Sequence, residues 1–201
     1  SIVSPIYRAE KIADRLVIAI EQAVKKITDN YEIILVEDGS PDKSWLVLER
    51  IAVQNDKVKA LKLSRNFGQH YAITAGLDQA KGEWVVVMDC DLQDNPEEIV
   101  NMLQTAKEKN ANIVLGQRLE RNDTFATVWF SKLFYKSLSY LSGAEWDPSI
   151  ANFGLFHQSV IKAISAMREP IRFFPAMVKW VGFHSVKMPV AHQARDEGTS
   201  N

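Results

Sequence analysis

Continuous apolar runs that alternate with amphipathic stretches constrain the fold of this chain more than any other feature. Residues 32–37 (EIILVE) and 83–88 (EWVVVM) lack regular polar alternation, which is typical of strands covered on both faces. Shorter β-branched runs predict further strands over residues 2–4, 58–63 and 113–115. Amphipathic spacing predicts helices over residues 12–27, 45–53 and 71–79, and from Pro96 to about Lys109. We therefore expect an α/β fold, with a mostly parallel central sheet and helices on both of its faces.

The chain changes in character after residue 122. Residues 125–141 (FATVWFSKLFYKSLSYL) are rich in aromatic side chains, with Lys132 and Lys136 one helical turn apart. Such a helix can lie in a membrane interface, or it can pack against the domain or against a dimer partner. After it we expect a loop over residues 143–151, a helix over 159–167, an apolar stretch over 173–181 and a strand over 186–190.

Composition limits the classes of function. With 201 residues, 46% of them hydrophobic and 24% charged, the chain has the size and make-up of one folded domain. A net charge of −1 argues against a general attraction to nucleic acid, so any anion binding must be local. One cysteine, Cys90, excludes an internal disulfide and fits a reducing compartment. The sequence holds no apolar run long enough to cross a bilayer, and because it starts without Met we expect it to be part of a longer protein.

Three aspartates are expected to meet at one edge of the sheet. Asp38 follows the apolar run 32–37, and Asp89 and Asp91 follow the run 83–88. All three therefore lie at the carboxyl ends of predicted strands, which is where open α/β sheets bind their ligands.

The acids after the second run suit a hard cation. If the segment is extended, Asp89, Asp91 and Gln93 share one side and offer oxygen ligands to Mg²⁺ or Mn²⁺, while Cys90 points into the core. The alternative is that the acids only cap the next helix, and Asp94 is the best placed residue for that.

Other polar residues at strand ends could bind parts of a nucleotide. Asp38 could accept from a nucleobase N–H or a ribose hydroxyl, and Pro5 and Tyr7 could contact a base. Arg65 and Arg118 each follow a predicted strand and could bind phosphate through a planar guanidinium. The alternatives are a simple Asp-Gly turn, core packing and surface arginines.

Together these features resemble the family 2 inverting glycosyltransferases, in particular the subgroup of dolichol- and polyprenyl-phosphate sugar synthases. The resemblance covers nearly the whole chain. Four blocks carry it: SPIYRAE (4–10), VEDGSPDKS (36–44), LSRNFGQHYAITAGLDQAKGEWVVVMDCDLQDNPEEI (63–99) and VLGQRLER (114–121). The third block, with its DxDLQD core after an apolar strand, is the most specific.

The resemblance implies a GT-A fold, which is Rossmann-like, and a set of site residues. It places the nucleoside-binding residues at Pro5, Tyr7, Glu10 and Asp38. It gives the Mg²⁺ or Mn²⁺ ligands as Asp89, Asp91 and Gln93. Arg118 would lie near the phosphates, and we expect Asp91 and Arg118 to be the catalytic residues. A loop that closes over the donor would contain Arg195, Gly198 and Ser200, which match an RxxGxS element.

The sequence departs from the family in one short segment. Relatives commonly carry a Gly-Asp-Phe-Arg-Leu type segment, and the matching residues here are 151–155 (ANFGL), so Asn152 replaces the acid and Gly154 the arginine. A phosphate acceptor is already ionised and needs little help from a general base, whereas a sugar hydroxyl would need one. The QxxRW element of processive synthases is absent from the sequence, which favours transfer of a single sugar.

We therefore expect a metal-dependent transferase of the cell envelope that acts from the cytoplasm, at the inner face of the membrane. Residues 1–122 would bind a UDP- or GDP-type sugar, and residues 123–201 would bind a lipid-linked acceptor and the membrane surface. A homo-oligomer is compatible with the aromatic segment. Relatives often continue into transmembrane helices. The alternatives are a nucleotidyltransferase that makes the sugar nucleotide, and a non-catalytic, transferase-like membrane module.

Overall fold

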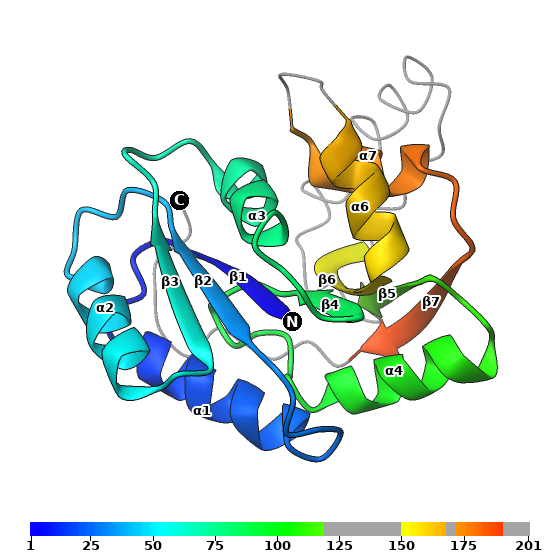
Figure 1. Ribbon diagram of the computed structural model, residues 1–201, viewed down its shortest axis with the longest axis horizontal. Helices are drawn as coiled ribbons and strands as arrows, with labels where there is room; N and C mark the ends of the chain where they lie inside the picture. The colour runs from blue at the N-terminus through cyan, green and yellow to red at the C-terminus, as the bar shows by residue number, and fades with distance from the viewer. Residues whose placement is uncertain (119–149, 168–171, 191–201) are drawn as a thin grey trace, which may run out of the picture.

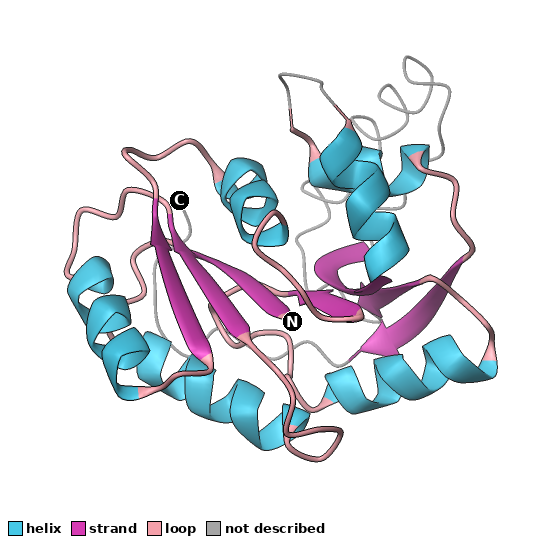
Figure 2. Cartoon of the chain, in the orientation of Figure 1, coloured by secondary structure: helices cyan, strands magenta, loops and turns pink. Residues whose placement is uncertain are grey.

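The computed structural model describes residues 1–118, 150–167 and 172–190. A seven-stranded sheet runs through these residues in the order β3-β2-β1-β4-β6-β5-β7. Figures 1 and 2 show it as a twisted central layer. Its strands are β1 (Ile2–Ile6), β2 (Ile33–Glu37), β3 (Val58–Lys62), β4 (Trp84–Val87), β5 (Ile113–Arg118), β6 (Ile150–His157) and β7 (Ser185–Val190).

The sheet is parallel except at β6. Strands β1 to β4 pair in parallel and so do β5 and β7, whereas β6 is antiparallel to both of its neighbours. The expected mostly parallel α/β sheet is confirmed. Because β6 and β7 come from the second part of the chain and join the same sheet, the parts on either side of residue 122 share one domain.

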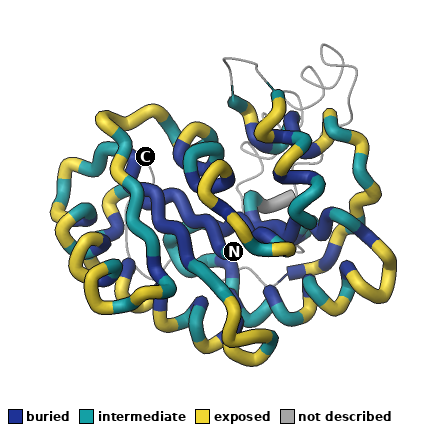
Figure 3. Tube along the Cα trace, in the orientation of Figure 1, coloured by how far each residue is buried: buried dark blue, intermediate teal, exposed yellow. Residues whose placement is uncertain are grey.

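Helices cover both faces of the sheet (Figure 1), as predicted. One face carries α1 (Ala13–Val24), α2 (Ser44–Gln54) and α4 (Glu98–Glu108). The other carries α3 (Gln69–Leu77), α6 (Gln158–Ala166) and α7 (Phe174–Trp180). Each face has its own hydrophobic cluster, and successive residues of the central strands alternate between the two. Figure 3 shows the strands between these layers as the most buried part of the chain.

Gly76 lets α3 approach the sheet closely. A Cβ at this position would lie 2.4 Å from Cγ1 of Val3 and 3.1 Å from Cγ2 of Val36. The glycine inside the predicted helix therefore serves packing against β1 and β2, at the modest cost in helix propensity that glycine carries.

Strand β6 was not predicted; its first residues were expected to belong to a loop. Asn152 and Gly154 interrupt the apolar pattern that marks the other buried strands. In the structure Gly154 lies where β5 and an aromatic ring approach closely, since a Cβ there would be 3.2 Å from Val114 O and 2.8 Å from the Phe156 ring. Packing in the folded sheet, which local sequence does not reveal, explains the glycine.

The other elements differ from prediction mainly at their ends. Helix α4 begins at Glu98, two residues after Pro96, because a tight turn precedes it. In that turn Asn95 Oδ1 accepts from Glu97 N at 3.1 Å, and Glu97, the N-cap residue of α4, makes no side-chain capping hydrogen bond. Residues 125–141 lie outside the described ranges. Within the described part, no helix is long and apolar enough to cross a membrane.

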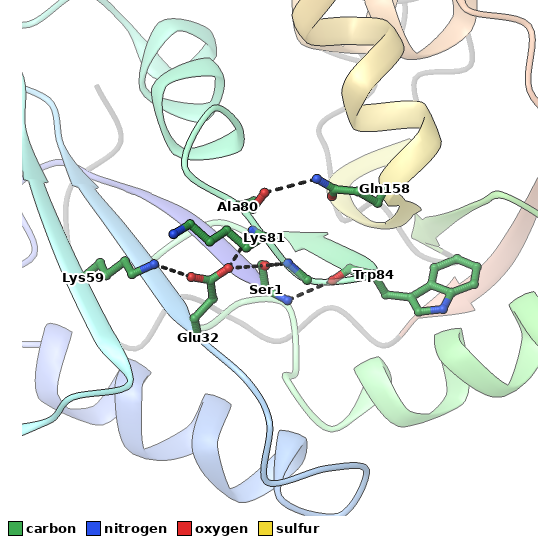
Figure 4. Close-up of polar contacts among 8 residues, drawn as sticks. Ser1, Glu32, Lys59, Ala80, Lys81, Trp84 and Gln158 are labelled. Carbon is green, nitrogen blue, oxygen red and sulfur yellow. Dashed lines mark hydrogen bonds and ion pairs between the residues drawn. The ribbon is translucent and has the colours of Figure 1, made fainter.

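The amino ends of the strands are held together by Glu32 (Figure 4). Its Oε1 accepts from Ser1 Oγ and from Lys81 N, both at 2.7 Å, and its Oε2 accepts from Lys59 Nζ at 2.6 Å. Burial opposes ionisation of Glu32, but these hydrogen bonds and the charge of Lys59 outweigh it and lower its pKa to about 2. This network lies at the edge opposite the candidate site.

Candidate active site

The sheet divides between β1 and β4, and this division creates the site. Val3 O accepts from Met88 N at 3.1 Å, but pairing of the two strands ends there. The backbone groups of Pro5, like those of Val3, face β4. Because β1 and β4 have already diverged at Pro5, the N–H that proline lacks costs no hydrogen bond between these strands. Next to β1 the sheet continues with β2 and then β3. Next to β4 it continues with β6, β5 and β7. Such a switch point is where open α/β sheets bind ligands.

Most of the predicted residues meet at this edge. Ile6, the last residue of β1, accepts at its carbonyl from Asp38 N at 3.0 Å, which fixes Asp38 beside the end of β1. The Tyr7 backbone lies close enough to the Cys90 thiol to lower its pKa in part, so the loop after β1 lies beside the loop after β4. Asp38, Tyr7 and the acids beside Cys90 therefore surround one strand end.

Cys90 is a structural residue. It packs against the cluster under α1 and α4, as its predicted inward orientation requires. Burial raises the pKa of its thiol to about 11, so the group stays protonated and unreactive at neutral pH.

Asp38 holds the loop that follows β3. Its Oδ1 accepts from Phe67 N at 2.7 Å and its Oδ2 from Gly68 N at 2.9 Å, and the side chain is buried. Gly39 has φ +64, and a Cβ there would lie 2.3 Å from Asn66 N, so the two loops touch backbone to backbone. The suggested Asp-Gly turn is thus a clamp on residues 65–68. Contact between Asp38 and a nucleoside stays a prediction. Such a contact would use the carboxylate lone pairs that do not accept from Phe67 N or Gly68 N.

Asp89 lies at the end of β4 and is half-buried. Gln69, the first residue of α3, donates from Nε2 to Asp89 Oδ1. Phe67 and Gly68, whose N–H groups donate to Asp38, directly precede Gln69 in the chain. Loop 65–69 therefore spans from the end of β2 to the end of β4.

The segment after Asp89 is a turn, so the expectation of an extended segment was wrong. Strand β4 ends at Val87, Leu92 has φ 59, and Asp91 Oδ1 accepts from Gln93 N at 3.1 Å. An Asp side chain that bonds the backbone two residues on stabilises such a turn. The alternation argument therefore does not place Gln93 beside both acids, and its role as a metal ligand stays a prediction.

Asp89 and Asp91 still suit a divalent cation. Both are half-buried carboxylates at the strand end. Mg²⁺ commonly takes one or two carboxylates together with substrate phosphates, rather than a cage made of protein. Among the described residues no group of three or more His, Cys, Asp or Glu side chains forms such a cage. A site of this kind depends on the donor to complete it.

Glu10 joins two loops beside the site. Its Oε2 accepts from Lys43 N at 3.0 Å, and its own N–H lies 3.4 Å from Asp42 Oδ2. Ser40 Oγ and Ser44 Oγ accept from the backbone of residues 8 and 9 at 3.1 and 2.8 Å. Glu10 thus fixes the loop after β1 to the loop after β2, and direct contact with a nucleoside stays a prediction.

Glu37 is a residue that the sequence analysis missed. It ends β2, pairs in register with Ile6, and is only 1% exposed. Its Oε1 accepts from Ser40 N–H. A carboxylate that ends an apolar run directly before Asp38 was the available signal, since burial of an acid needs compensation.

Asn152 and Arg118 also reach this edge of the sheet. Val87 pairs with Gly154 across the antiparallel β4–β6 ladder, so Asp89, just beyond β4, and Asn152, within β6, lie two residues further toward the same edge of the sheet. Arg118 is the last residue of β5, which runs to this edge too, but its side chain lies outside what the structure describes. Arg195, Gly198 and Ser200 also lie outside the described ranges.

Arg65 is exposed in the clamped loop. Its guanidinium stacks on the Phe67 ring, with Cζ 4.3 Å from the ring centroid. Stacking leaves guanidinium N–H groups at the rim for other partners. An anion site at Arg65 stays a prediction.

Comparison with known proteins gives the family. The family model described as glycosyl transferase family 2 matches residues 1–165, so the chain belongs to that family and the resemblance is confirmed. The undecaprenyl-phosphate 4-deoxy-4-formamido-L-arabinose transferase of Pseudomonas fluorescens (strain Pf0-1) is 36% identical over 201 residues. That match takes in 100% of this chain and 59% of the relative, so the chain spans less than two thirds of the relative's length.

Solved structures share the fold at low identity. The mannosyltransferase PcManGT from Pyrobaculum calidifontis, in complex with GDP-Man and Mn²⁺, matches 98% of this chain and 57% of its own, with TM-score 0.66 and 15% identity. The glucosyl-3-phosphoglycerate synthase from Mycobacterium tuberculosis, in complex with Mn²⁺, UDP and phosphoglyceric acid, matches 96% of this chain and 70% of its own, with TM-score 0.66 and 16% identity. The GT-A fold is therefore confirmed.

Proposed function

We propose that this chain is the catalytic domain of an inverting transferase that moves one sugar from a nucleotide-diphosphate sugar to a polyprenyl phosphate or another lipid-linked acceptor. The observation that carries the proposal is the position of Asp89 and Asp91 directly after β4, at the switch point of the sheet. The relative from Pseudomonas fluorescens, whose name states an undecaprenyl-phosphate acceptor, supports the same class of reaction.

Donor binding is proposed for the carboxyl edge of the strands within residues 1–118. Asp89 and Asp91, with Gln93 as a third candidate, would hold Mg²⁺ or Mn²⁺ against the donor diphosphate. When bound, the cation would neutralise charge that develops on the leaving nucleoside diphosphate. The hydrogen bonds from residues 67 and 68 to Asp38 hold the loop after β3 in place, so little ordering of this loop is needed on binding.

Acceptor activation is proposed to need no general base. Asn152 lies at the site edge, at the position where the family resemblance places an acid, and an amide cannot take a proton from a hydroxyl. A phosphate monoester is ionised at neutral pH and attacks as an anion without proton removal. This favours a phosphate over a sugar hydroxyl as the acceptor. Contact with a membrane surface follows from a lipid-linked acceptor and belongs to the same proposal.

Ligand-dependent thermal unfolding tests the donor half of the proposal. The protein is heated with UDP-, GDP-, CDP- or dTDP-linked sugars, each with Mn²⁺ and with EDTA. A ligand present at 100 times its Kd should stabilise the fold by about 2.7 kcal/mol. We expect one nucleotide to do so only with Mn²⁺, and Asp91→Ala to abolish the shift. Asp14→Ala, which removes a surface ion pair with Arg50, is the matched control. If no nucleotide stabilises the wild-type protein, the non-catalytic alternative gains.

A further inference from the structure

Arg172 is a half-buried cation whose buried end has no partner. Its Nη1 is buried and makes no hydrogen bond, and within the described ranges its guanidinium forms no ion pair. Burying an unpaired charged group destabilises a folded protein, because the group loses water and gains nothing in return. A fold that keeps such a group without a protein acceptor is expected to use it for an anion that comes from outside.

A second unpaired nitrogen lies in the same region. His70 Nδ1, in the first turn of α3, is also buried without a hydrogen-bond partner. The His70 ring packs edge-on against Phe173, with ring centroids 4.9 Å apart, and Phe173 is the residue next to Arg172. Burial lowers the pKa of His70, so the ring is neutral at pH 7 and its unpaired nitrogen can donate one N–H.

This region adjoins the candidate active site through consecutive contacts. Gln69, which donates to Asp89, directly precedes His70 in α3. His70 contacts Phe173, and helices α3 and α7 are in contact. Arg172 is therefore linked to the proposed diphosphate site through its neighbour Phe173, which contacts His70, and through Gln69, which precedes His70.

Exposed aromatic rings lie at the start of α3 and just before α7. Phe67, Tyr71 and Phe173 are large apolar side chains that are 37–40% exposed. Phe67 and Tyr71 lie 6.4 Å apart between ring centroids, and Tyr71 follows His70 in α3. A ligand that combined an anionic head with an apolar tail would match both the unpaired cation and these rings.

We propose that Arg172 binds the phosphate of a polyprenyl monophosphate acceptor, with His70 as a second donor and with Phe173, Tyr71 and Phe67 against its first isoprene units. This inference rests on the proposed function, which it makes more specific by naming where the acceptor phosphate lies. It assigns the acceptor head group to Arg172, which lies just before α7, and to the start of α3.

Geranyl phosphate, a short and soluble polyprenyl monophosphate, is the probe for this site. Its affinity is measured by titration calorimetry alongside inorganic phosphate and geraniol. We expect geranyl phosphate to bind more tightly than either. Arg172→Met should weaken its binding by about 10- to 100-fold, because charge-assisted hydrogen bonds to the phosphate are lost. Arg172→Lys should retain part of the affinity, since an ammonium still binds phosphate as a point charge.

Stability separates a ligand-binding role from a structural one. Removal of a buried cation without a partner should leave the midpoint of thermal unfolding of the free protein unchanged or raise it, whereas removal of a structural arginine should lower it. Arg50→Met, which breaks the surface pair with Asp14, is the matched control and should leave geranyl phosphate binding unchanged.

Several outcomes would overturn the assignment. These are unchanged geranyl phosphate binding in Arg172→Met, a clear loss of stability in the free variant, or inorganic phosphate that binds as tightly as geranyl phosphate. The Mn²⁺-dependent nucleotide shift is measured in parallel. If it persists while geranyl phosphate fails to bind, the acceptor site is wrong and donor binding stands. If it is absent while Arg172-dependent binding of geranyl phosphate persists, the proposed transferase fails and the phosphate site stands.

Discussion

The side-chain amide of Gln69 donates a hydrogen bond to Asp89 Oδ1, joining the start of α3 to the end of β4. Loop 65–69, which leads into this residue, is held at its other end by Asp38. The orientation of a proposed metal ligand is therefore set by a residue from another element. Outer-sphere hydrogen bonds of this kind orient ligands and tune metal affinity.

Replacing Gln69 should weaken metal-dependent donor binding without unfolding the protein. In Gln69→Leu the Asp89 carboxylate loses the hydrogen bond from the Gln69 amide, and we expect the affinity for Mn²⁺ with nucleotide to fall about 10-fold or more. Calorimetric titration of Mn²⁺ in the presence of the nucleoside diphosphate measures this change independently of turnover. The control is Gln104→Leu on α4, whose amide donates to Glu108 at 2.7 Å on the exposed face. Equal affinities in the two variants would contradict the proposed role of Gln69.

Asp38 should contribute to stability as well as to the site. Asp38→Ala leaves the N–H groups of Phe67 and Gly68 without their carboxylate acceptor, and we expect a loss of about 3 kcal/mol in the free energy of unfolding. Asp38→Asn keeps one oxygen acceptor and should lose less. Urea unfolding of the free protein measures both variants. If Asp38→Ala were as stable as wild type, the clamp would be energetically unimportant.

The positions of Asp38 and Asp89 could be predicted, but their partners could not. Continuous apolar runs at 32–37 and 83–88 indicate buried parallel strands, whose carboxyl ends share one edge. That reasoning placed Asp38 and Asp89 correctly. It gave no sign that Asp38 accepts hydrogen bonds from Phe67 N and Gly68 N, which are far from it in the sequence, because such contacts depend on how loops pack.

Local conformation was the other source of error. The prediction carried the strand through Met88 and extended it over Asp89 to Gln93, whereas pairing ends earlier and the chain turns at Leu92. Nothing in the residue types requires a left-handed leucine, so the turn reflects its tertiary setting. Strand β6 was missed for a related reason. Its Asn152 and Gly154 are explained by the site edge and by close packing, and neither is visible in local periodicity.

The contact between the loops at Gly39 can be tested against a second glycine. Gly39 and Gly182 have similar φ angles, +64 and +68, but only Gly39 has backbone atoms closer than 3 Å to the position of a Cβ. Gly182→Ala should therefore cost only the strain of a left-handed residue, about 1 kcal/mol. Gly39→Ala should cost clearly more, because Asn66 and Arg65 must move. Thermal unfolding of the two variants makes the comparison, and equal losses would show that the loops can separate easily.

Glu32 should make stability depend on pH in the acidic range. Its pKa is lowered from 4.5 to about 2 in the folded protein, so the unfolded state binds more protons between these values. The stabilisation is therefore complete above about pH 4.5 and is lost as the pH falls toward 2. Its upper size is on the order of 3 kcal/mol, from 1.36 kcal/mol per pKa unit.

Unfolding in urea at a series of pH values tests the role of Glu32. Glu32→Gln cannot ionise, so it should remove this part of the pH dependence and lower stability at neutral pH. Glu97, a half-exposed carboxylate that pairs with Lys26, provides the control variant Glu97→Gln. The role of Glu32 would be rejected if both variants kept the wild-type pH dependence.

Asn152 tests whether the acceptor needs a base. In Asn152→Asp a carboxylate stands at the edge where Asp89 leaves the sheet. If transfer to the acceptor required proton removal, a new base could raise the rate by about 100-fold or more. Because a phosphate acceptor is already ionised, we expect kcat for transfer to geranyl phosphate to change less than about threefold, since base catalysis has no proton to remove. The rate should also gain no new dependence on pH between 5 and 8, where the acid would titrate if it served as a base.

A large gain in rate for a hydroxyl acceptor such as geraniol, with none for geranyl phosphate, would show that this strand end selects the acceptor by its ionisation. A large gain with geranyl phosphate itself would contradict the proposed mechanism.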